Sequence, residues 1–398
     1  PDVDFGEYEF TFLTISSGIN STTRFTDEIF VEEEDGDIIN DSVYQRNQLV
    51  NEKYNVKITA LPEDNPLETA RSAIMAGDSI FDVMNIRKDE IITLLPDGLL
   101  ADWNDLPYCD YTAPWWNRHC AEKLIIGDML PFMSGSILIS EIDDTLAMVY
   151  NKDIATEYQI ENLYNVVREG RWTVEYMTGI IKEISRDLNG DSQYVVGDDL
   201  FGYVQDPASM TTNWVFASDL VNGYIDDDGL WQDNVDMERA QELCDKMSAI
   251  FGSGNFAYTG TDLYEGLNYF EENKIFLYAI ILRNVELLRE MDVDFGILPY
   301  PKLNEQQEEY ITHVGNASPI LTLPITNTDT ERTSLILEAM AIASYEIVRP
   351  AYYEVALKVK MSRDEDSADM LDLILDSSTY DLSYFAYNSI TSILNPLI

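Results

Sequence analysis

Two prolines close an apolar segment late in the chain, and this feature constrains the fold most. Residues 294–302 read Asp-Phe-Gly-Ile-Leu-Pro-Tyr-Pro-Lys, and a second extended apolar run follows at 320–325 after a polar gap. Because proline has no N–H to donate to a central ladder, Pro299 and Pro301 end strand pairing and hold the chain extended. The pattern predicts that the chain crosses here from one lobe of the molecule to another.

A matching crossing segment lies upstream. Residues 143–153 place an apolar strand between polar ends, just before a helix-like stretch at 154–158. Downstream, the capping-box pattern Thr328-x-x-Glu331 begins a helix, and Pro350 lies just past its expected end, which predicts a third crossing. A chain of 398 residues suits two domains of common size.

We therefore expect two lobes, each assembled from separate parts of the chain. The first lobe takes residues 1–150 plus 316–349, and the second takes residues 151–315 plus 350–398.

Three stretches of the chain resemble one protein family. They are Phe295 to Lys302, Met370-Leu-Asp-Leu-Ile374, and Val167-Arg-Glu-Gly-Arg-Trp-Thr173, which opens a helix. The family is the extracellular solute-binding proteins of ABC importers, in particular the sugar-binding, maltodextrin-binding-like branch of Gram-positive gut bacteria, and the likeness extends over nearly the whole chain.

The resemblance implies an α/β fold with two lobes of the periplasmic-binding-protein type (type II), joined by hinge crossings. It implies a non-enzymatic clamp that closes on a carbohydrate, which we expect to be an oligosaccharide, and hands it to the permease subunits of an ABC transporter in the membrane. We expect an extracellular monomer, anchored to the membrane by a lipid on residues that precede this numbering.

The acidic composition excludes several kinds of partner. There are 72 acidic and 25 basic residues, for a net charge of -47. This charge argues against binding to nucleic acid or to anionic lipid, and its simplest role is to keep an exported protein in solution. The longest apolar run, at 275–282, is far short of the ~18 residues of a membrane span and predicts a buried strand or helix segment.

The first ninety residues predict a βαβαβ unit. It comprises a strand at 10–16, a helix at 41–54, a strand at 56–61, a helix at 66–76 and a strand at 81–86. Right-handed crossovers place the first strand between the other two, and ligands of such sheets lie beyond the carboxyl ends of the strands.

Polar residues after these strands are therefore candidate ligand contacts. They are Ser17 and Asn20 after the first strand, and Asn85 and Arg87 after the third. The alternative for each is an ordinary turn residue or a solvated charge.

Aromatic residues are the second chemical signal, with 24 Tyr, 15 Phe and 6 Trp. Sugar rings present apolar faces that stack on flat side chains, while their hydroxyl groups need polar partners. The candidates for these roles are Tyr44, Trp115, Trp214, Trp231, Arg283 and Asn316. The alternatives are core packing for the tryptophans, as we expect for Trp172 at a helix start, and a surface ion pair for the arginine.

An acidic loop resembles an EF-hand calcium loop. Oxygen-bearing side chains occupy alternating positions and the last position: Asp187, Asn189, Asp191, Gln193 and Asp198. Ser192 replaces the expected glycine, and Asp198 is shorter than the usual bidentate glutamate. The loop predicts either a structural Ca²⁺ or an acidic turn without metal, and we expect no cofactor for catalysis.

No common catalytic motif is present: there is no Gly-x-Ser-x-Gly, Walker A, His-Glu-x-x-His or Gly-x-Gly-x-x-Gly pattern. A glycoside hydrolase stays an alternative because it needs only two carboxylates. A peptide-binding or polyamine-binding protein is another, because it would exploit the acidic charge. Of the three cysteines, Cys109 and Cys120 form either a disulfide or buried thiols.

Overall fold

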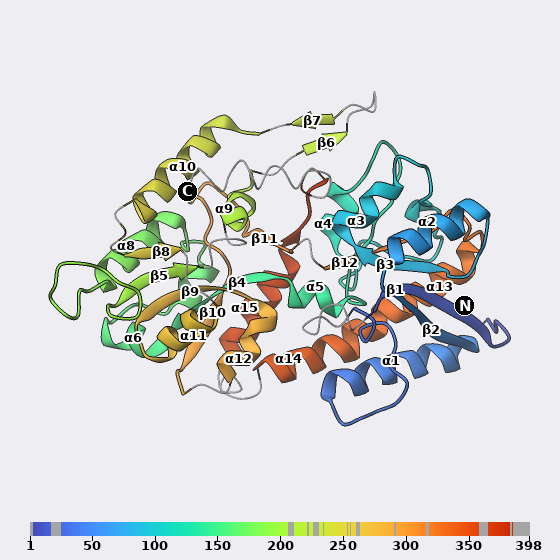
Figure 1. Cartoon of the computed structure of the whole chain (residues 1–398), viewed down its shortest axis with the longest axis horizontal. Coiled ribbons are helices and arrows are strands. Elements are labelled where there is room, and N and C mark those ends of the chain that lie inside the picture. The colour runs from blue at the N-terminus through green and yellow to red at the C-terminus, as the bar shows by residue number, and fades with distance from the viewer. Residues whose placement is uncertain are drawn as a thin grey trace.

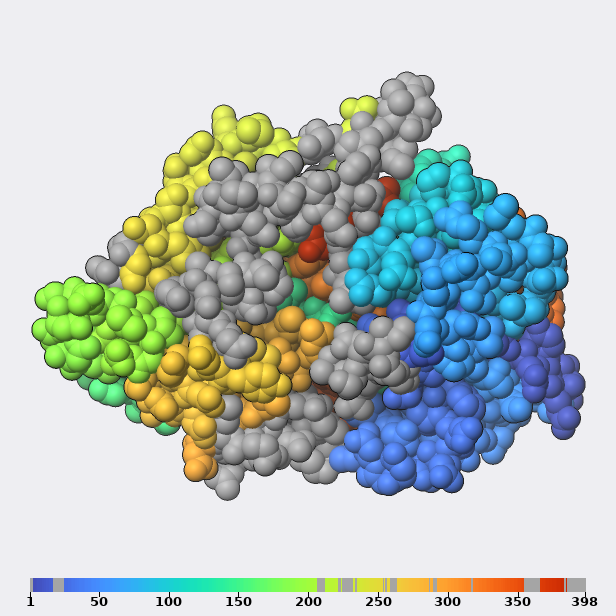
Figure 2. All heavy atoms as spheres, viewed as in Figure 1, coloured from blue at the N-terminus to red at the C-terminus, as the bar shows by residue number. Residues whose placement is uncertain are grey.

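The computed structural model has two lobes side by side, each built around its own sheet (Figure 1). It describes residues 3–16, 25–205, 211–220, 223–225, 231–233, 235–252, 254, 256–259, 263–289, 292–315, 318–357, 365–382 and 384. In the space-filling view, the blue first lobe and the green to orange second lobe flank a red C-terminal segment (Figure 2).

The first lobe begins with the predicted βαβαβ unit, which is confirmed. Its elements are β1 (Tyr8–Ile15), α1 (Ile38–Tyr54), β2 (Val56–Glu63), α2 (Pro66–Ala76) and β3 (Val83–Arg87). Strand β1 pairs in parallel with β2 on one side and β3 on the other. The crossover from β1 to β2 and the crossover from β2 back past β1 to β3 run in opposite directions across the sheet, so α1 and α2 cover opposite faces.

Strand β12 (Pro319–Thr322) completes this sheet by pairing antiparallel with β3, in the order β12-β3-β1-β2. Local chemistry fixes the helices, since the Asp37 side chain caps the start of α1 and the Asn65 side chain caps α2. The first lobe also contains α3 (Lys88–Ile91), η1 (Ile92–Leu94), η2 (Trp103–Asp105), α4 (Arg118–Lys123) and α5 (Ile139–Asp143).

The second lobe has a five-stranded sheet in the order β10-β4-β9-β5-β8. The strands are β4 (Leu146–Asn151), β5 (Phe201–Gln205), β8 (Ala257–Thr259), β9 (Ile275–Ile281) and β10 (Phe295–Leu298). Strands β4 and β9 are buried along nearly their whole length, because clusters of apolar side chains cover both faces of the sheet.

Helices surround this sheet on both faces. They are α6 (Lys152–Glu157), α7 (Leu163–Arg168), α8 (Val174–Ile184), α9 (Thr211–Ala217), α10 (Met237–Phe251), α11 (Leu263–Glu271), α12 (Val285–Arg289) and α15 (Glu365–Asp376), with η3 (Leu282–Asn284) before α12. A small hairpin, β6 (Gly223–Ile225) and β7 (Trp231–Asp233), extends from this lobe (Figure 1).

The chain crosses between the lobes downstream of the two prolines, since Leu303 and Tyr310 still pack in the core of the second lobe. Strand β10 belongs to the second sheet and β12 to the first, so the segment after Pro299 and Pro301 connects the lobes. The upstream crossing precedes β4, whose pairing with β9 and β10 places it in the second sheet. The boundary predicted after residue 150 therefore falls inside a strand of the second lobe.

The two crossing segments run side by side. Thr145 and Val314 form an antiparallel bridge, and the Gly315 N–H donates to the Asp144 carbonyl at 3.0 Å. A short parallel sheet of β11 (Thr312–His313) and β13 (Ser378–Thr379) adjoins them. Several independent strands thus meet at the hinge.

The third connection is a helix. The predicted helix end before Pro350 is wrong, because α13 (Thr330–Ala343) continues through a π-helical turn, η4 (Ser344–Val348), into α14 (Arg349–Leu357). The wider turn places Pro350 at the second residue of α14, where its missing N–H disrupts the ladder least. Asp329, next to the predicted Thr328, provides the N-cap of α13.

Two of the three family-like stretches pack against each other. The Lys302 N–H donates to the Trp172 carbonyl at 3.1 Å, and the Val174 N–H donates to the Lys302 carbonyl at 2.9 Å. The Trp172 indole is fully buried and donates to the Pro299 carbonyl at 2.9 Å. Trp172 is therefore a packing residue, as predicted. Cys109 and Cys120 are free thiols, so the predicted alternative of a disulfide between them is wrong.

Candidate ligand-binding site between the lobes

The topology of the first sheet marks one crevice. From β1 the chain turns to β2 on one side and then to β3 on the other, so the carboxyl ends of β1 and β3 flank a topological switch point. The end of β3 meets the crossing segments, because the Lys88 ammonium group donates to the Gly315 carbonyl at 3.2 Å. This crevice therefore faces the hinge and the second lobe.

Asp144 lies at the centre of a charged cluster at this hinge. Its carboxylate binds the Arg283 guanidinium of the second lobe, and Arg87 and Lys88 of the first lobe exert favourable electrostatic effects on it. Burial raises the pKa of Asp144, and the three cations oppose that rise. The cluster joins both lobes to the first crossing segment.

The structure thus brings two predicted site residues, Arg87 and Arg283, to the same carboxylate. Each cation also has a local partner: Arg87 donates to Asp89 at 2.8 and 3.1 Å, and Arg283 binds Asp144. Both arginines thus form ion pairs, which is the predicted alternative for Arg283, whereas the alternative for Arg87 was a solvated charge.

Lys88 is a site residue that the sequence reasoning missed. It is fully buried and donates to the Ser318 hydroxyl at 2.5 Å, while its ammonium group lies 4.9 Å from the centre of the Tyr380 ring. Burial lowers the pKa of Lys88 to about 8, against the pull of nearby carboxylates. Its position directly after a buried strand, beside the predicted Arg87, is the signal that could have identified it.

His313 occupies the second crossing segment. Its ring stacks on Phe216 of α9 at 4.0 Å between centroids, and its Nδ1 lies 2.9 Å from the Asn213 Oδ1. Burial and, to a smaller extent, Lys88 lower the pKa of His313 to about 3, so the ring is neutral. This histidine joins the hinge to the second lobe.

Asn85 points into the first lobe. Its side chain donates to Glu28 at 2.9 Å and to the Phe25 carbonyl at 3.3 Å, and it is fully buried within β3. Through these two hydrogen bonds, Asn85 fixes the segment that leads from β1 to α1.

Trp214 packs in the core of the second lobe. It is fully buried, its indole N–H donates to Gln205 at 3.0 Å, and its ring contacts Tyr203 and Tyr300 edge to face. This burial favours the core alternative over stacking on a ligand.

For the remaining predicted ligand contacts, the structure gives at most their place in the fold. Tyr44 is half-buried on α1, and Trp231 is the first residue of β7. Ser17, Asn20 and Asn316 lie outside the described residues.

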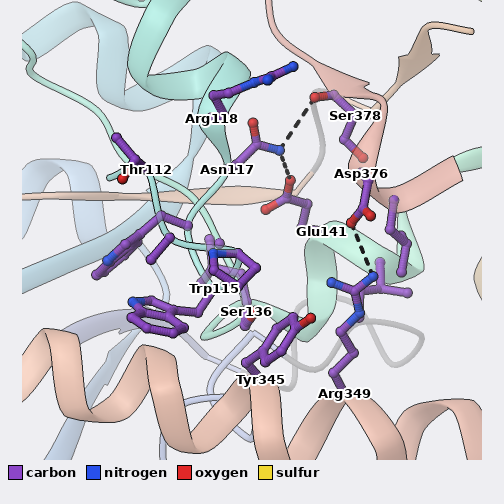
Figure 3. Close-up of a pocket in the computed structure, with 17 residues that line it drawn as sticks. Thr112, Trp115, Asn117, Arg118, Ser136, Glu141, Tyr345, Arg349, Asp376 and Ser378 are labelled. Carbon is purple, nitrogen blue, oxygen red and sulfur yellow. Dashed lines mark hydrogen bonds and ion pairs between the residues drawn. The ribbon is translucent and has the colours of Figure 1, made fainter. Parts of the chain in front are cut away.

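A cavity of about 360 Å³ lies between the loop before α4, the α13–α14 connection and the end of α15. We call it the Trp115 cavity, and its volume is at the lower end of the roughly 300–1,000 Å³ of ligand pockets. Figure 3 shows Trp115 and Tyr345 on one side, and Arg349 and Asp376 on another. The first lobe, the connecting helix and the second lobe all contribute to its wall.

Several polar groups of the Trp115 cavity pair with one another. Asn117 donates to Glu141 at 3.0 Å, and Arg349 contacts Asp376 at 3.3 Å (Figure 3). The Trp115 indole N–H donates to Glu338 at 2.9 Å, which holds the ring in place while leaving it half-buried. The cavity combines an aromatic surface with balanced charges.

The acidic loop is organised by its own backbone. Asp187 accepts the N–H groups of Gly190 at 2.6 Å and Ser192 at 2.8 Å, and Ser192 adopts a left-handed conformation with φ of 65°. Ser192 thus makes the sharp turn for which calcium loops use glycine. Among the described residues, however, no three acidic, histidine or cysteine side chains are placed to hold a metal. Calcium binding by Asn189, Asp191, Gln193 and Asp198 with Asp187 stays a prediction.

Comparison with known proteins identifies the fold. No family model matches the chain, and no curated protein matches it in sequence. Solved structures match over nearly the full length. A cyclo/maltodextrin-binding protein complexed with maltotetraose shares 10% identity with a TM-score of 0.61, covering 98% of this chain and 91% of that one.

Two further structures are similar. An ABC substrate-binding protein from Listeria monocytogenes, in complex with cycloalternan, has 13% identity and a TM-score of 0.56 over 98% of this chain and 93% of that one. The GacH receptor of Streptomyces glaucescens, solved unliganded and with acarbose, has 14% identity and a TM-score of 0.55 over 98% and 92%. The predicted two-lobed α/β fold of the periplasmic-binding-protein type is confirmed.

Within the described part of the chain, none of the helices combines the length and the apolar character that a membrane crossing needs.

Proposed function

We propose that this chain is the substrate-binding component of an ABC importer, which captures an oligosaccharide between its lobes and delivers it to the permease. The observation that carries the proposal is the hinge: the carboxyl end of β3, two crossing segments and a second-lobe arginine converge on Asp144. A ligand held there touches both lobes at once. The sugar ligands of the similar structures support a carbohydrate.

The proposal includes an extracellular location, a monomeric state and a lipid anchor. Labelling of the protein with a radioactive fatty acid in the cells that produce it tests the anchor, and a protein that stays unlabelled and in the soluble fraction would contradict it.

The binding screen is a thermal-shift assay against a glycan library, with peptides and polyamines as controls. We expect neutral oligosaccharides to raise the melting temperature by mass action on the folded state. A response to polyamines or peptides alone would favour that alternative, in which carboxylates replace ring stacking.

The hydrolase alternative is tested on the same ligands. A clamp returns the oligosaccharide intact after long incubation, whereas a glycoside hydrolase releases shorter products. Chromatography of the incubated ligand separates the two. In the Trp115 cavity, the two carboxylates Glu141 and Asp376 are both engaged by neighbouring donors, which does not favour an acid and base pair.

The Trp115 cavity is the second candidate place for the ligand. If Trp115 stacks on a sugar ring, Trp115→Ala weakens binding by about 1–3 kcal/mol. Tyr108→Ala is the matched control, because Tyr108 is an exposed aromatic residue in the same loop and does not line the cavity. Equal affinities of the two variants would place the ligand at the hinge alone.

A further inference from the structure

The third connection between the lobes contains η4, the only π-helical turn in the described part of the chain. Here the Arg349 N–H donates to the Ser344 carbonyl, five residues back, where an α-helix would bond four residues back. Pro350 follows directly and has no N–H to donate. Because π-turns are rare and frequently lie at functional sites, the position of this one between two lobes needs a physical reason.

The helix before the turn is fixed to the first lobe. Leu337 and Met340 of α13 are buried in the core cluster of that lobe. At the start of the turn, the Arg46 guanidinium of α1 donates to the Ser344 hydroxyl at 3.3 Å, and both side chains are fully buried. The chain up to Ser344 therefore belongs mechanically to the first lobe.

The helix after the turn is tied to the second lobe. Val348 is buried in the apolar cluster that contains residues of β4 and β9. Arg349, the first residue of α14, donates to Asp372 at 2.9 Å and contacts Asp376 at 3.3 Å, and both carboxylates belong to α15. The change from one lobe to the other thus takes place within the π-turn.

The lobes also touch directly beside the turn. Ile39 and Val43 of α1 lie in the same apolar cluster as Val348. The Tyr352 hydroxyl of α14 donates to Asp143 at 2.9 Å, directly before the first crossing segment. Contacts close to a rotation axis change least when two bodies rotate, so this packing is compatible with an axis that passes near η4.

The turn has space on another side. Close-packed side chains normally leave a helix little freedom to change direction. Tyr345 and Arg349, however, line the Trp115 cavity of about 360 Å³ (Figure 3). A small change in the direction of α14 can therefore alter this cavity without forcing packed side chains into one another.

Of the three connections, the helix is the one that resists bending. The first two are extended segments, in which a few backbone dihedral angles can absorb a rotation. An α-helix bends sharply only where its hydrogen-bond ladder is interrupted, as at a proline or a π-turn. The third connection has both, at adjacent positions.

We propose that η4, followed by Pro350, is the flexible joint of the third connection, at which α14 and the second lobe change direction relative to α13 and the first lobe. The inference rests on the proposed function, since a clamp requires its lobes to rotate, and it specifies the element that permits the rotation. The joint depends on the extra residue that a π-turn holds. Removal of one residue restores an α-helical ladder while the flanking helices keep their buried faces.

The first test is hydrogen–deuterium exchange of the unmodified protein without ligand. A joint that bends opens its hydrogen bonds locally, whereas helix turns fixed in a core open only at higher free energy. We expect the amides of residues 345–349 to exchange at least about tenfold faster than those of residues 336–342 in α13. Equally slow exchange in both segments overturns the inference.

The second test removes the extra residue. Deletion of Glu346, which is exposed on the turn, is compared with Glu346→Ala, which keeps the residue count. Spin labels on cysteines at Glu52 of α1 and Glu183 of α8, both exposed, report the distance between the lobes by double electron–electron resonance. All proteins carry Cys109→Ser and Cys244→Ser, because these two thiols are not fully buried.

We expect the parent and Glu346→Ala to show a broad distribution of distances, and the deletion variant to show a single narrower one. An equally broad distribution in the deletion variant overturns the inference and leaves the proposed function in place. A parent confined to one narrow distance, with and without maltotetraose, contradicts the clamp as well. Circular dichroism checks that the deletion variant is folded, and the exchange rates of the unmodified protein decide if it is not.

Discussion

Glu28 is a buried carboxyl group whose protonation should make the stability of the first lobe depend on pH. It accepts hydrogen bonds from Asn85 on β3 at 2.9 Å and from the Ser140 N–H at the start of α5 at 2.7 Å. Arg46 of α1 is also fully buried and is attracted to it. Glu28 thus ties the segment after β1 to the helix that leads into the hinge.

Burial raises the pKa of Glu28 from 4.5 to about 7, and its hydrogen bonds from Ser140 and Asn85 oppose the rise. Because the folded-state pKa is the higher one, the stabilisation by this group is complete below about pH 4.5 and is lost as the pH rises to about 7. A pKa difference of about 2.5, at about 1.36 kcal/mol for each pKa unit, corresponds to about 3 kcal/mol.

The substitution Glu28→Gln tests this reasoning, since glutamine imitates the protonated acid and does not titrate. We expect the unfolding free energy of the parent, relative to the variant, to fall by about 3 kcal/mol between about pH 4 and about pH 8. The opposite trend from His313, whose lowered pKa removes stability as the pH falls from 6.5 towards about 3, is common to both proteins and cancels.

The assay is urea unfolding of parent and variant side by side across this pH range. Curves of stability against pH that run parallel would refute the argument, because they would show that Glu28 titrates alike in the folded and unfolded states.

Three further predictions concern packing, metal and motion. Trp214→Ala and Trp172→Ala should each lower the unfolding free energy by roughly 3–5 kcal/mol in denaturant melts, and a variant that melts like the parent would contradict its core assignment. If the acidic loop holds calcium, a chelator should lower the melting temperature, added calcium should restore it, and Asp187→Ala should abolish the response. Equal melting temperatures with chelator and with calcium would contradict calcium binding by this loop. A saturating oligosaccharide should reduce the radius of gyration in small-angle scattering, and an unchanged profile with a tight ligand would count against a clamp.

Local chemistry explains which parts of the fold were predictable. The βαβαβ unit was read correctly because its strands are apolar runs bounded by turn residues, and its helices begin at capping side chains such as Asp37 and Asn65. The crossing after Pro299 was predictable for a similar reason, since proline restricts its own backbone wherever it occurs.

The errors concern distant contacts. The strand at 146–151 was recognised, but only its pairing with β9 and β10 assigns it to the second sheet, and pairing between remote segments leaves no local pattern. Pro350 was read as a helix end because the sequence around it has no local signal for the π-helical turn, beside which Val348 and Tyr352 are buried among residues remote in sequence.

In the candidate site too, residues with a local sequence signal were predicted and residues that depend on remote contacts were not. Arg87 was found because the carboxyl end of a parallel strand is a local and general signal. Lys88 was missed although it is adjacent, because its burial depends on Ser318 and Tyr380, which are remote in sequence. Trp214 was placed in the cleft because composition cannot distinguish a tryptophan that stacks on a ligand from one that fills a core.

The charge of the chain gives the hinge cluster a wider role. With a net charge of -47, the two lobes carry like charges and repel each other as they approach. Basic residues are scarce, yet Arg87 and Lys88 from the first lobe and Arg283 from the second gather around one aspartate between them. They lower the repulsion where the lobes come closest, within the distance over which salt does not fully screen it. In the proposed clamp, this cluster would therefore lower the electrostatic cost of bringing two acidic lobes together at the hinge.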